Sequence, residues 1–161
     1  EGTIIEDPCG TCRGSGRKVK QQTVEINIPP GMTEEIQLRI PDRGEPGIRG
    51  AGSGHLYVQV VIDTHPQFKR NGTDVYVEVP LSISQAAMGA QIEVPTLDGK
   101  QKMGVEAGTQ PDTHKILRGK GVQRLHSPGH GDLIVILKVV IPKNLTERQK
   151  TLMTELAAEE K

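Results

Sequence analysis

The chain has few aromatic residues and no excess of either charge among its 161 residues. Tyr57, Phe68 and Tyr76 are its only aromatic side chains, too few for a platform on which nucleic-acid bases stack. Lysine and arginine number 20, as do aspartate and glutamate, so the formal net charge is zero. Because phosphate neutralisation needs a basic excess, we expect no nucleic-acid partner.

Long hydrophobic runs and catalytic motifs are also missing. No apolar stretch approaches the roughly 18 residues of a membrane-spanning helix, so we expect no membrane partner. No nucleophile elbow, Walker loop or zinc-protease pattern occurs, and no cluster supplies an acid, a base and a nucleophile. We therefore predict a protein that is not an enzyme. The chain begins at Glu1 without a signal-peptide pattern, and we interpret it as part of a longer protein.

Turn residues, by contrast, are abundant, with 19 glycines and 11 prolines, which indicates many short strands. Apolar and polar residues alternate, as in half-buried strands, over 24–28, 36–40, 56–62, 75–79 and 133–139. Pro80 is expected to end the fourth of these strands, and Asp98-Gly99 predicts a β-hairpin. Helical patterns are confined to 82–89 and to the residues from Thr146 onward, each opened by a capping box. The pattern predicts an all-β fold with a short C-terminal helix.

An internal repeat becomes visible when the chain is shifted by 77 residues. The coinciding glycines are Gly31 with Gly108, Gly44 with Gly121, Gly52 with Gly129, and Gly54 with Gly131. Leu56 and Val58 then fall on Leu133 and Val135, in the strand after the last glycine. We therefore predict two tandem, similar β-sandwich-like domains. The first copy would start before Glu1, so we expect it to be truncated and to carry the cysteine segment as an insertion.

Cys9 and Cys12 form the sharpest local motif. Two thiolates at this spacing can hold one face of a tetrahedral zinc ion, which needs four ligands, so the chain carries half of such a site. Incidental thiols are the alternative on spacing alone. A thiol oxidoreductase is a third possibility, disfavoured because Arg-Gly-Ser-Gly rather than a helix follows the pair. His126 and His130 lie in a glycine- and proline-containing loop, and we interpret them as solvated residues.

The motif Cys9-Gly-Thr-Cys12-Arg-Gly14-Ser-Gly16 resembles the last of the four Cys-x-x-Cys-x-Gly-x-Gly repeats of class I DnaJ-type co-chaperones. The resemblance continues, in that family's order, to about residue 156. Its further motifs include Ile28-Pro-Pro-Gly31-Met, His65-Pro-Gln-Phe68-Lys-Arg70, Gln85-Ala-Ala-Met-Gly89, Val94-Pro-Thr-Leu-Asp-Gly99 and Leu117-Arg-Gly-Lys-Gly121. It implies two β-sandwich-like C-terminal domains, the first interrupted by a zinc-binding module.

The resemblance also implies a division of the chain. The ranges are a remnant of the zinc-binding module at 1–18, an incomplete C-terminal domain I at 19–69, C-terminal domain II at 70–143 and a dimerisation helix at 144–161. In that family zinc is shared between the first and the fourth cysteine repeats, and only the fourth is matched here. Cys9 and Cys12 would thus be half of a zinc site that is complete in the longer protein.

The function implied by the resemblance is a cytoplasmic co-chaperone that binds unfolded polypeptides and passes them to a DnaK-type ATPase chaperone. The expected client-binding residues are Val24, Ile26 and Val58, and the expected homodimer contacts are Leu152, Met153 and Leu156. From the residues alone, the same stripe could instead pack on the second domain. The chain lacks a J-domain, so we expect no stimulation of the ATPase by this part. The alternative function is a β-scaffold that only dimerises and spaces other domains.

One departure from the family concerns a turn. His55 stands where the family and the second copy, at Asp132, have an aspartate. We therefore expect the turn that His55 caps to differ from its counterpart.

Overall fold

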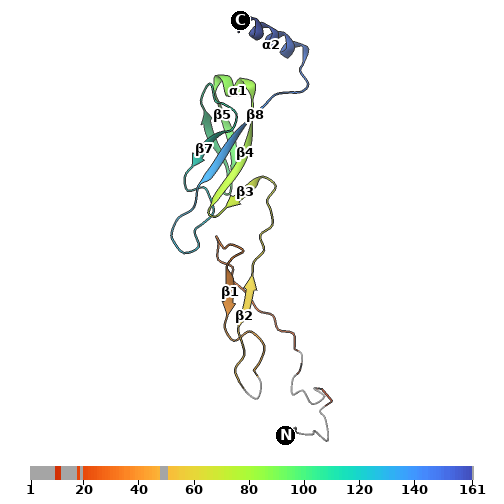
Figure 1. Cartoon of the computed structure of the whole chain (residues 1–161), viewed down its shortest axis with the longest axis vertical. Coiled ribbons are helices and arrows are strands. Elements are labelled where there is room, and N and C mark those ends of the chain that lie inside the picture. Colours follow the sequence, from red (N-terminus) through yellow and green to blue (C-terminus); the bar gives the residue numbers. More distant parts are fainter. Residues whose placement is uncertain (1–9, 12–17, 19, 48–50, 161) are drawn as a thin grey trace. The chain divides into compact units, whose positions relative to one another are not determined.

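A computed structural model describes residues 10–11, 18, 20–47 and 51–160 (Figure 1). Its elements in chain order are β1 (Gln37–Ile40), β2 (Leu56–Gln59), β3 (Phe68–Asn71), β4 (Asp74–Ser82), α1 (Ile83–Met88), β5 (Ala90–Thr96), β6 (Gly99–Val105), β7 (Thr113–Leu117), β8 (Leu133–Val140) and α2 (Glu147–Glu159). The all-β prediction, with one short C-terminal helix, is confirmed. No helix among the described residues has both the length and the apolar character needed to cross a bilayer.

Contacts within the chain divide it into two units. The N-terminal unit comprises residues of 1–28 and 40–56, and the C-terminal unit comprises 29–39 and 57–161. Strands β1 and β2 pair with each other in a sheet of two strands. The domain ranges expected from the sequence were based on the family resemblance rather than on contacts, and they stay a prediction.

The C-terminal unit is built on a four-stranded sheet with the order β3-β4-β8-β7 (Figure 1). Its two central strands, β4 and β8, run parallel from the pair Val75–Leu133 to the pair Ser82–Val140. The outer strands β3 and β7 pair antiparallel to them. Strands β5 and β6 form a separate hairpin, as predicted, but its ladder closes at Thr96 and Gly99, so its turn residues are Leu97 and Asp98 rather than the predicted Asp98 and Gly99.

The core of this unit lies between the sheet and the hairpin. Alternate residues of β4 and β8 point inward because successive side chains of a strand face opposite ways. The buried cluster contains Val75, Val77, Val79, Leu81, Leu133, Val135 and Leu137 from the sheet and Ile92, Val94 and Val105 from the hairpin. Burying one such side chain completely contributes about 1.5–3 kcal/mol. The apolar alternation of two strands thus holds this unit together.

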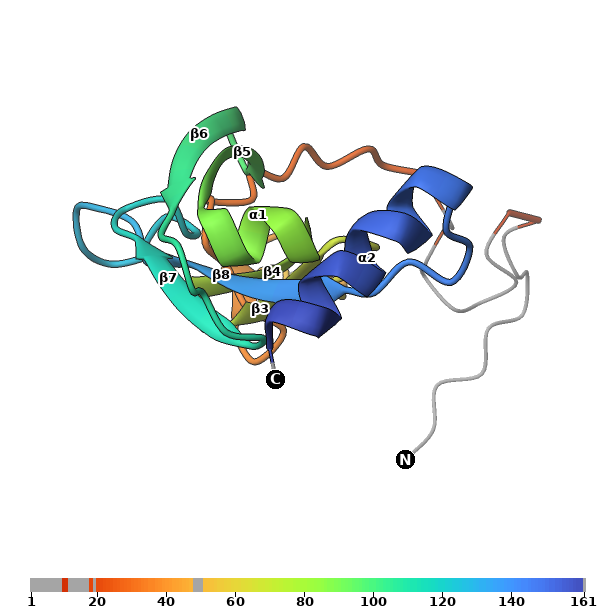
Figure 2. The same ribbon diagram turned by 90° about the horizontal axis from the view of Figure 1, so that it is seen from above.

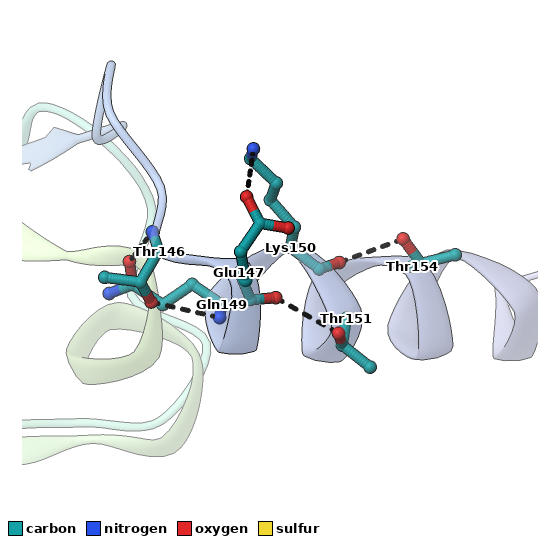
Figure 3. A network of polar contacts seen from close by, with 6 residues as sticks. All are labelled: Thr146, Glu147, Gln149, Lys150, Thr151 and Thr154. Atoms are coloured by element: carbon teal, nitrogen blue, oxygen red, sulfur yellow. Dashed lines mark hydrogen bonds and ion pairs between the residues drawn. The ribbon is translucent and has the colours of Figure 1, made fainter.

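Both predicted capping boxes are confirmed. Ser82 and Gln85 cap α1 reciprocally, and α1 packs against β4 and β8 (Figure 2). Thr146 and Gln149 cap α2 in the same way (Figure 3). The Thr146 N–H donates to Gln149 Oε1 at 2.9 Å, and the Gln149 N–H donates to Thr146 Oγ1 at 3.3 Å. Each pair satisfies two backbone donors that a helix start leaves open.

Two strand predictions are wrong. Residues 24–28 alternate but form no strand, because a strand needs a hydrogen-bonded neighbour and none pairs with them among the described residues. Pro80 does not end β4, which continues to Ser82. Strand β3 pairs only with Asp74–Val77, so no strand on that side of β4 requires an N–H from Pro80. Strand β2 is also shorter than predicted, ending at Gln59.

The 77-residue repeat reappears as a repeat of hydrogen bonds. The matched bonds are Gly44 N–H to Gly54 O (2.9 Å) with Gly121 N–H to Gly131 O (2.8 Å), Gly54 N–H to Glu45 O (2.8 Å) with Gly131 N–H to Val122 O (2.9 Å), and Gly47 N–H to Gly52 O (3.2 Å) with Arg124 N–H to Gly129 O (3.0 Å). In each copy this loop lies between an edge strand, β1 or β7, and its partner, β2 or β8. The two copies therefore share the same loop-in-hairpin geometry.

The turn at His55 keeps its form, contrary to expectation. In the second copy, Asp132 Oδ1 accepts a hydrogen bond from the Gly119 N–H at 2.8 Å. In the first copy, His55 Nδ1 accepts one from the Asp42 N–H at 3.4 Å. Asp42 and Gly119 both have positive φ angles, 56° and 67°. An imidazole nitrogen can replace a carboxylate oxygen here because a neutral ring offers one acceptor.

Candidate functional site

The two-stranded sheet of β1 and β2 exposes part of its apolar face. Leu38 and Val58, both in the C-terminal unit, are half-buried, whereas Val135, the counterpart of Val58 in β8, is 0% exposed. Alternation places apolar side chains on one side of each strand, but here the cover on that side is incomplete. Val58 thus remains accessible to a partner of the chain.

Val24 and Ile26, the other two predicted client-binding residues, lie in the N-terminal unit. They belong to no helix or strand. Val24 is half-buried and Ile26 is 36% exposed. Val58 belongs to the other unit.

The structure brings the three predicted dimerisation residues together at one groove. Leu152, Met153 and Leu156 of α2 line it with Ile83 and Met88 of α1, and the groove encloses about 550 Å³. Helix α2 has no buried residue, and its apolar stripe is 37–51% exposed. Such a stripe is one that a second polypeptide could cover.

A second groove, of about 650 Å³, opens on the outer side of β4 and β8. Tyr76 and Ile136, whose side chains alternate with the buried core residues, line it together with Pro66, Pro80 and Pro95. Polar and charged side chains line the same groove, namely Gln67, Lys69, Arg70, Asn71, Glu78 and Glu93. Its lining is therefore mixed, with apolar surface for contact beside groups of both charges.

The predicted metal ligands Cys9 and Cys12 lie outside the described residues. Within the part of the chain that the structure describes, no three His, Cys, Asp or Glu side chains gather as a metal site. His126 and His130 are exposed, and the backbone of His130 forms a bridge with Gln123.

Two ion pairs of the C-terminal unit lie at strand β7. Lys115 of β7 pairs with Glu106, and Asp112, just before β7, pairs with Lys138 of β8. The hydrogen bond and the charge of Lys115 lower the pKa of Glu106, and those of Asp112 raise the pKa of Lys138. All of these groups retain substantial contact with solvent, where such pairs contribute little to stability. We interpret both pairs as structural contacts at the sheet edge.

Sequence reasoning missed the polar contacts that hold the residues on the C-terminal side of Val58. Glu34, Gln59 and Arg70 hold the segments next to β2 through main-chain atoms of distant turns. The only sequence signal was the presence of Arg70 in the His65–Arg70 motif, which indicates nothing about its partners.

Comparison with known proteins assigns most of the chain to one family. The DnaJ C terminal domain matches residues 6–142. A protein named Chaperone protein DnaJ from Parageobacillus thermoglucosidasius is 45% identical over 151 residues, covering 94% of this chain and 40% of that protein. Proteins of the same name from Caldicellulosiruptor bescii and Neisseria meningitidis are 47% and 46% identical over 154 residues each. The chain spans about two fifths of the length of these curated relatives.

Proposed function

The chain belongs to the DnaJ C-terminal domain family, and from this premise we propose that it is the client-binding part of a co-chaperone. The resemblance drawn from the sequence motifs is confirmed at the level of the family. In the longer protein, this part would hold unfolded polypeptides until a DnaK-type ATPase chaperone accepts them. Delivery to that chaperone and a cytoplasmic location belong to the same proposal.

The incompletely covered apolar face beside Val58 carries the proposal. Clients of a general chaperone differ in sequence, so recognition has to use main-chain hydrogen bonds and tolerant apolar contacts. Among the described strands, β1 and β2 pair only with each other, so an extended client could add to this short sheet as a further strand, and the half-buried valine and leucine offer the apolar contact. Strand addition of this kind would bind an extended client with little regard to its sequence.

Val58→Asp is expected to weaken capture of an unfolded client at least about fivefold, because a carboxylate in an apolar contact must be desolvated. The measurement is binding of reduced, carboxymethylated α-lactalbumin by fluorescence anisotropy. Tyr57→Asp is the matched control, since it places the same charge on the opposite, exposed side of β2. Circular dichroism should show both variants folded. Unchanged capture by Val58→Asp would contradict the assignment and favour a β-scaffold that only dimerises and spaces other domains.

Val24 and Ile26 are proposed as a further client contact in the N-terminal unit. Val24→Asp should weaken capture of the same client, and Thr23→Asp, at an exposed neighbouring position, should leave it unchanged. Equal effects of the two variants would remove Val24 from the proposal.

The exposed stripe of α2 is proposed as the homodimer contact of this part. Leu152→Asp should convert the dimer to a monomer at micromolar concentration, because the charge would enter the apolar contact made by Leu152, Met153 and Leu156. Light scattering coupled to gel filtration measures the mass. Thr151→Glu changes a residue on another side of the same helix and should leave the dimer intact. A wild-type chain that is monomeric throughout would refute the contact.

Cys9 and Cys12 are proposed to supply two of the four zinc ligands of the longer protein. Paired thiolates at this spacing suit a tetrahedral zinc site, and the metal would stabilise the fold of its own module rather than take part in a reaction. The other two ligands would come from outside the residues described here.

A further inference from the structure

Arg70 joins two turns of the C-terminal unit through main-chain carbonyl groups. Its Nη2 donates to Gly31 O at 2.8 Å and its Nη1 donates to Met32 O at 3.0 Å. Its Nε donates to Gly72 O, in the turn between β3 and β4, at 2.8 Å. The planar guanidinium presents these donors in a fixed arrangement, which a lysine ammonium cannot reproduce. One side chain thus fastens residues 31–32 to the start of the four-stranded sheet.

The turn at residues 31–32 also packs against the loop that precedes β8. Gly31 has a φ of 85°, and a Cβ atom added to it would lie 2.1 Å from Gln123 O. Met32 is 4% exposed and is the only buried hydrophobic residue that the described N-terminal half of the chain, up to residue 74, contributes. The turn is therefore held between Arg70 and Gln123.

The second copy holds its counterpart of this turn by different contacts. Gly108, the counterpart of Gly31, has a φ of 78°, so the two glycines adopt the same left-handed conformation. The Gly108 N–H donates to Ala87 O at 3.1 Å and the Thr109 N–H donates to Ala86 O at 3.0 Å, so this turn is held against helix α1. A Cβ atom on Gly108 would nevertheless have no atom within 4 Å, and the collision with Gln123 is therefore specific to Gly31.

The docked turn continues into residues that hold the end of strand β2. Two residues after Met32, Glu34 Oε1 accepts a hydrogen bond from the Ile62 N–H at 2.8 Å. The Gln59 side chain donates to Glu34 O at 3.3 Å. Contacts thus run from Arg70 through residues 31–34 to the chain on the C-terminal side of Val58.

We propose that Arg70 is a positioning residue for client binding, which acts by docking residues 31–34 and thereby fixing strand β2 and Val58. The inference rests on the proposed function of Val58 and extends it to a side chain that need not touch the client. Fixing a binding strand in advance lowers the entropic cost of binding, because fewer conformations are lost when the client arrives.

Two variants disrupt the docked turn from opposite sides, and each has a matched control. Arg70→Gln removes the guanidinium, and Gly31→Ala introduces the collision with Gln123. Lys69→Gln removes a cation from the neighbouring position of β3, and among the described residues Lys69 forms an ion pair only with exposed Glu78. Gly108→Ala imposes the same positive-φ strain as Gly31→Ala but without a collision.

Hydrogen exchange followed by mass spectrometry tests the docking without any client. We expect the amides of Ile36 and Ile62, whose N–H groups donate to Thr33 O and Glu34 Oε1, to exchange at least about tenfold faster in Arg70→Gln and Gly31→Ala, because opening of the docked turn exposes them to water. The controls should exchange like the wild type, and Arg70→Lys should not restore protection. Unchanged exchange in Arg70→Gln, or full protection in Arg70→Lys, would overturn the proposal.

Client binding then tests the positioning role. Arg70→Gln should weaken capture of carboxymethylated α-lactalbumin at least about threefold with exchange in β4 and β8 unchanged, a split that general destabilisation would not produce. The double variant Gly31→Ala/Arg70→Gln should bind no more weakly than the weaker single variant, because both changes act through one contact. Faster exchange with unchanged capture overturns the positioning role. The proposed function is decided separately by Val58→Asp, so the two failures can be told apart.

Discussion

Replacing Gly131 with alanine is expected to lower the free energy of unfolding of the C-terminal unit by about 3 kcal/mol or more. A Cβ atom at this position would lie 2.1 Å from Thr73 O and 2.4 Å from Thr73 C. Both are main-chain atoms at the start of β4, where the Val75 N–H donates to Asp132 O at 2.9 Å. No change of rotamer can relieve such a collision, so the two central strands would have to separate at this end.

Gly54→Ala is the internal control for this prediction. Gly54 is the counterpart of Gly131 in the repeat and makes the same kind of hydrogen bond to the loop. The nearest atom to its added Cβ would be Glu45 O at 3.7 Å, an ordinary contact. We expect a loss below about 1 kcal/mol. Urea unfolding followed by circular dichroism measures the stability of both variants. Equal losses of stability would show that the close contact with Thr73 is not the reason why position 131 requires glycine.

Local signals in the sequence predicted local structure well. The hairpin predicted at Asp98-Gly99 and the two capping boxes depend on neighbouring residues only, and all three are present, with the hairpin turn one residue earlier than predicted. The alternation of 133–139 predicted β8 but not its parallel partner, because β4 lies almost 60 residues earlier in the chain. The alternation of 24–28 had the same form and gave no strand, since periodicity does not specify whether a neighbour is available.

At the candidate site, too, the sequence predicts some features and not others. The half-buried position of Val58 could be predicted because alternation places it on the apolar side of its strand, whereas the client-binding role implied by the family resemblance stays a prediction. The contacts of Arg70 could not be predicted, because its three acceptors are carbonyl groups of two separate turns. Any residue type supplies a carbonyl, so no pattern of side chains marks such a contact. Only the folded backbone brings these acceptors to one guanidinium.

The two copies of the repeat use one loop geometry for different purposes. In the second copy the strand after the loop, β8, is the centre of a four-stranded sheet covered by a hairpin. In the first copy the equivalent strand, β2, pairs with β1 alone among the described strands. Burial by neighbouring elements therefore distinguishes β8, which stabilises the fold, from β2, where we propose the client contact.

Leu133→Ala is expected to cost about 2–5 kcal/mol of stability, because it opens a cavity in the closed core around a side chain that is 0% exposed. Leu56→Ala, at the equivalent position of the first copy, should cost less than half as much. Leu56 is only half-buried, so less apolar surface returns to water when its side chain is shortened. Urea unfolding of the two variants, monitored by circular dichroism, gives the comparison. If the two losses were equal, the strand that carries Val58 would be as closely packed as β8 and would have no apolar face to offer to a client.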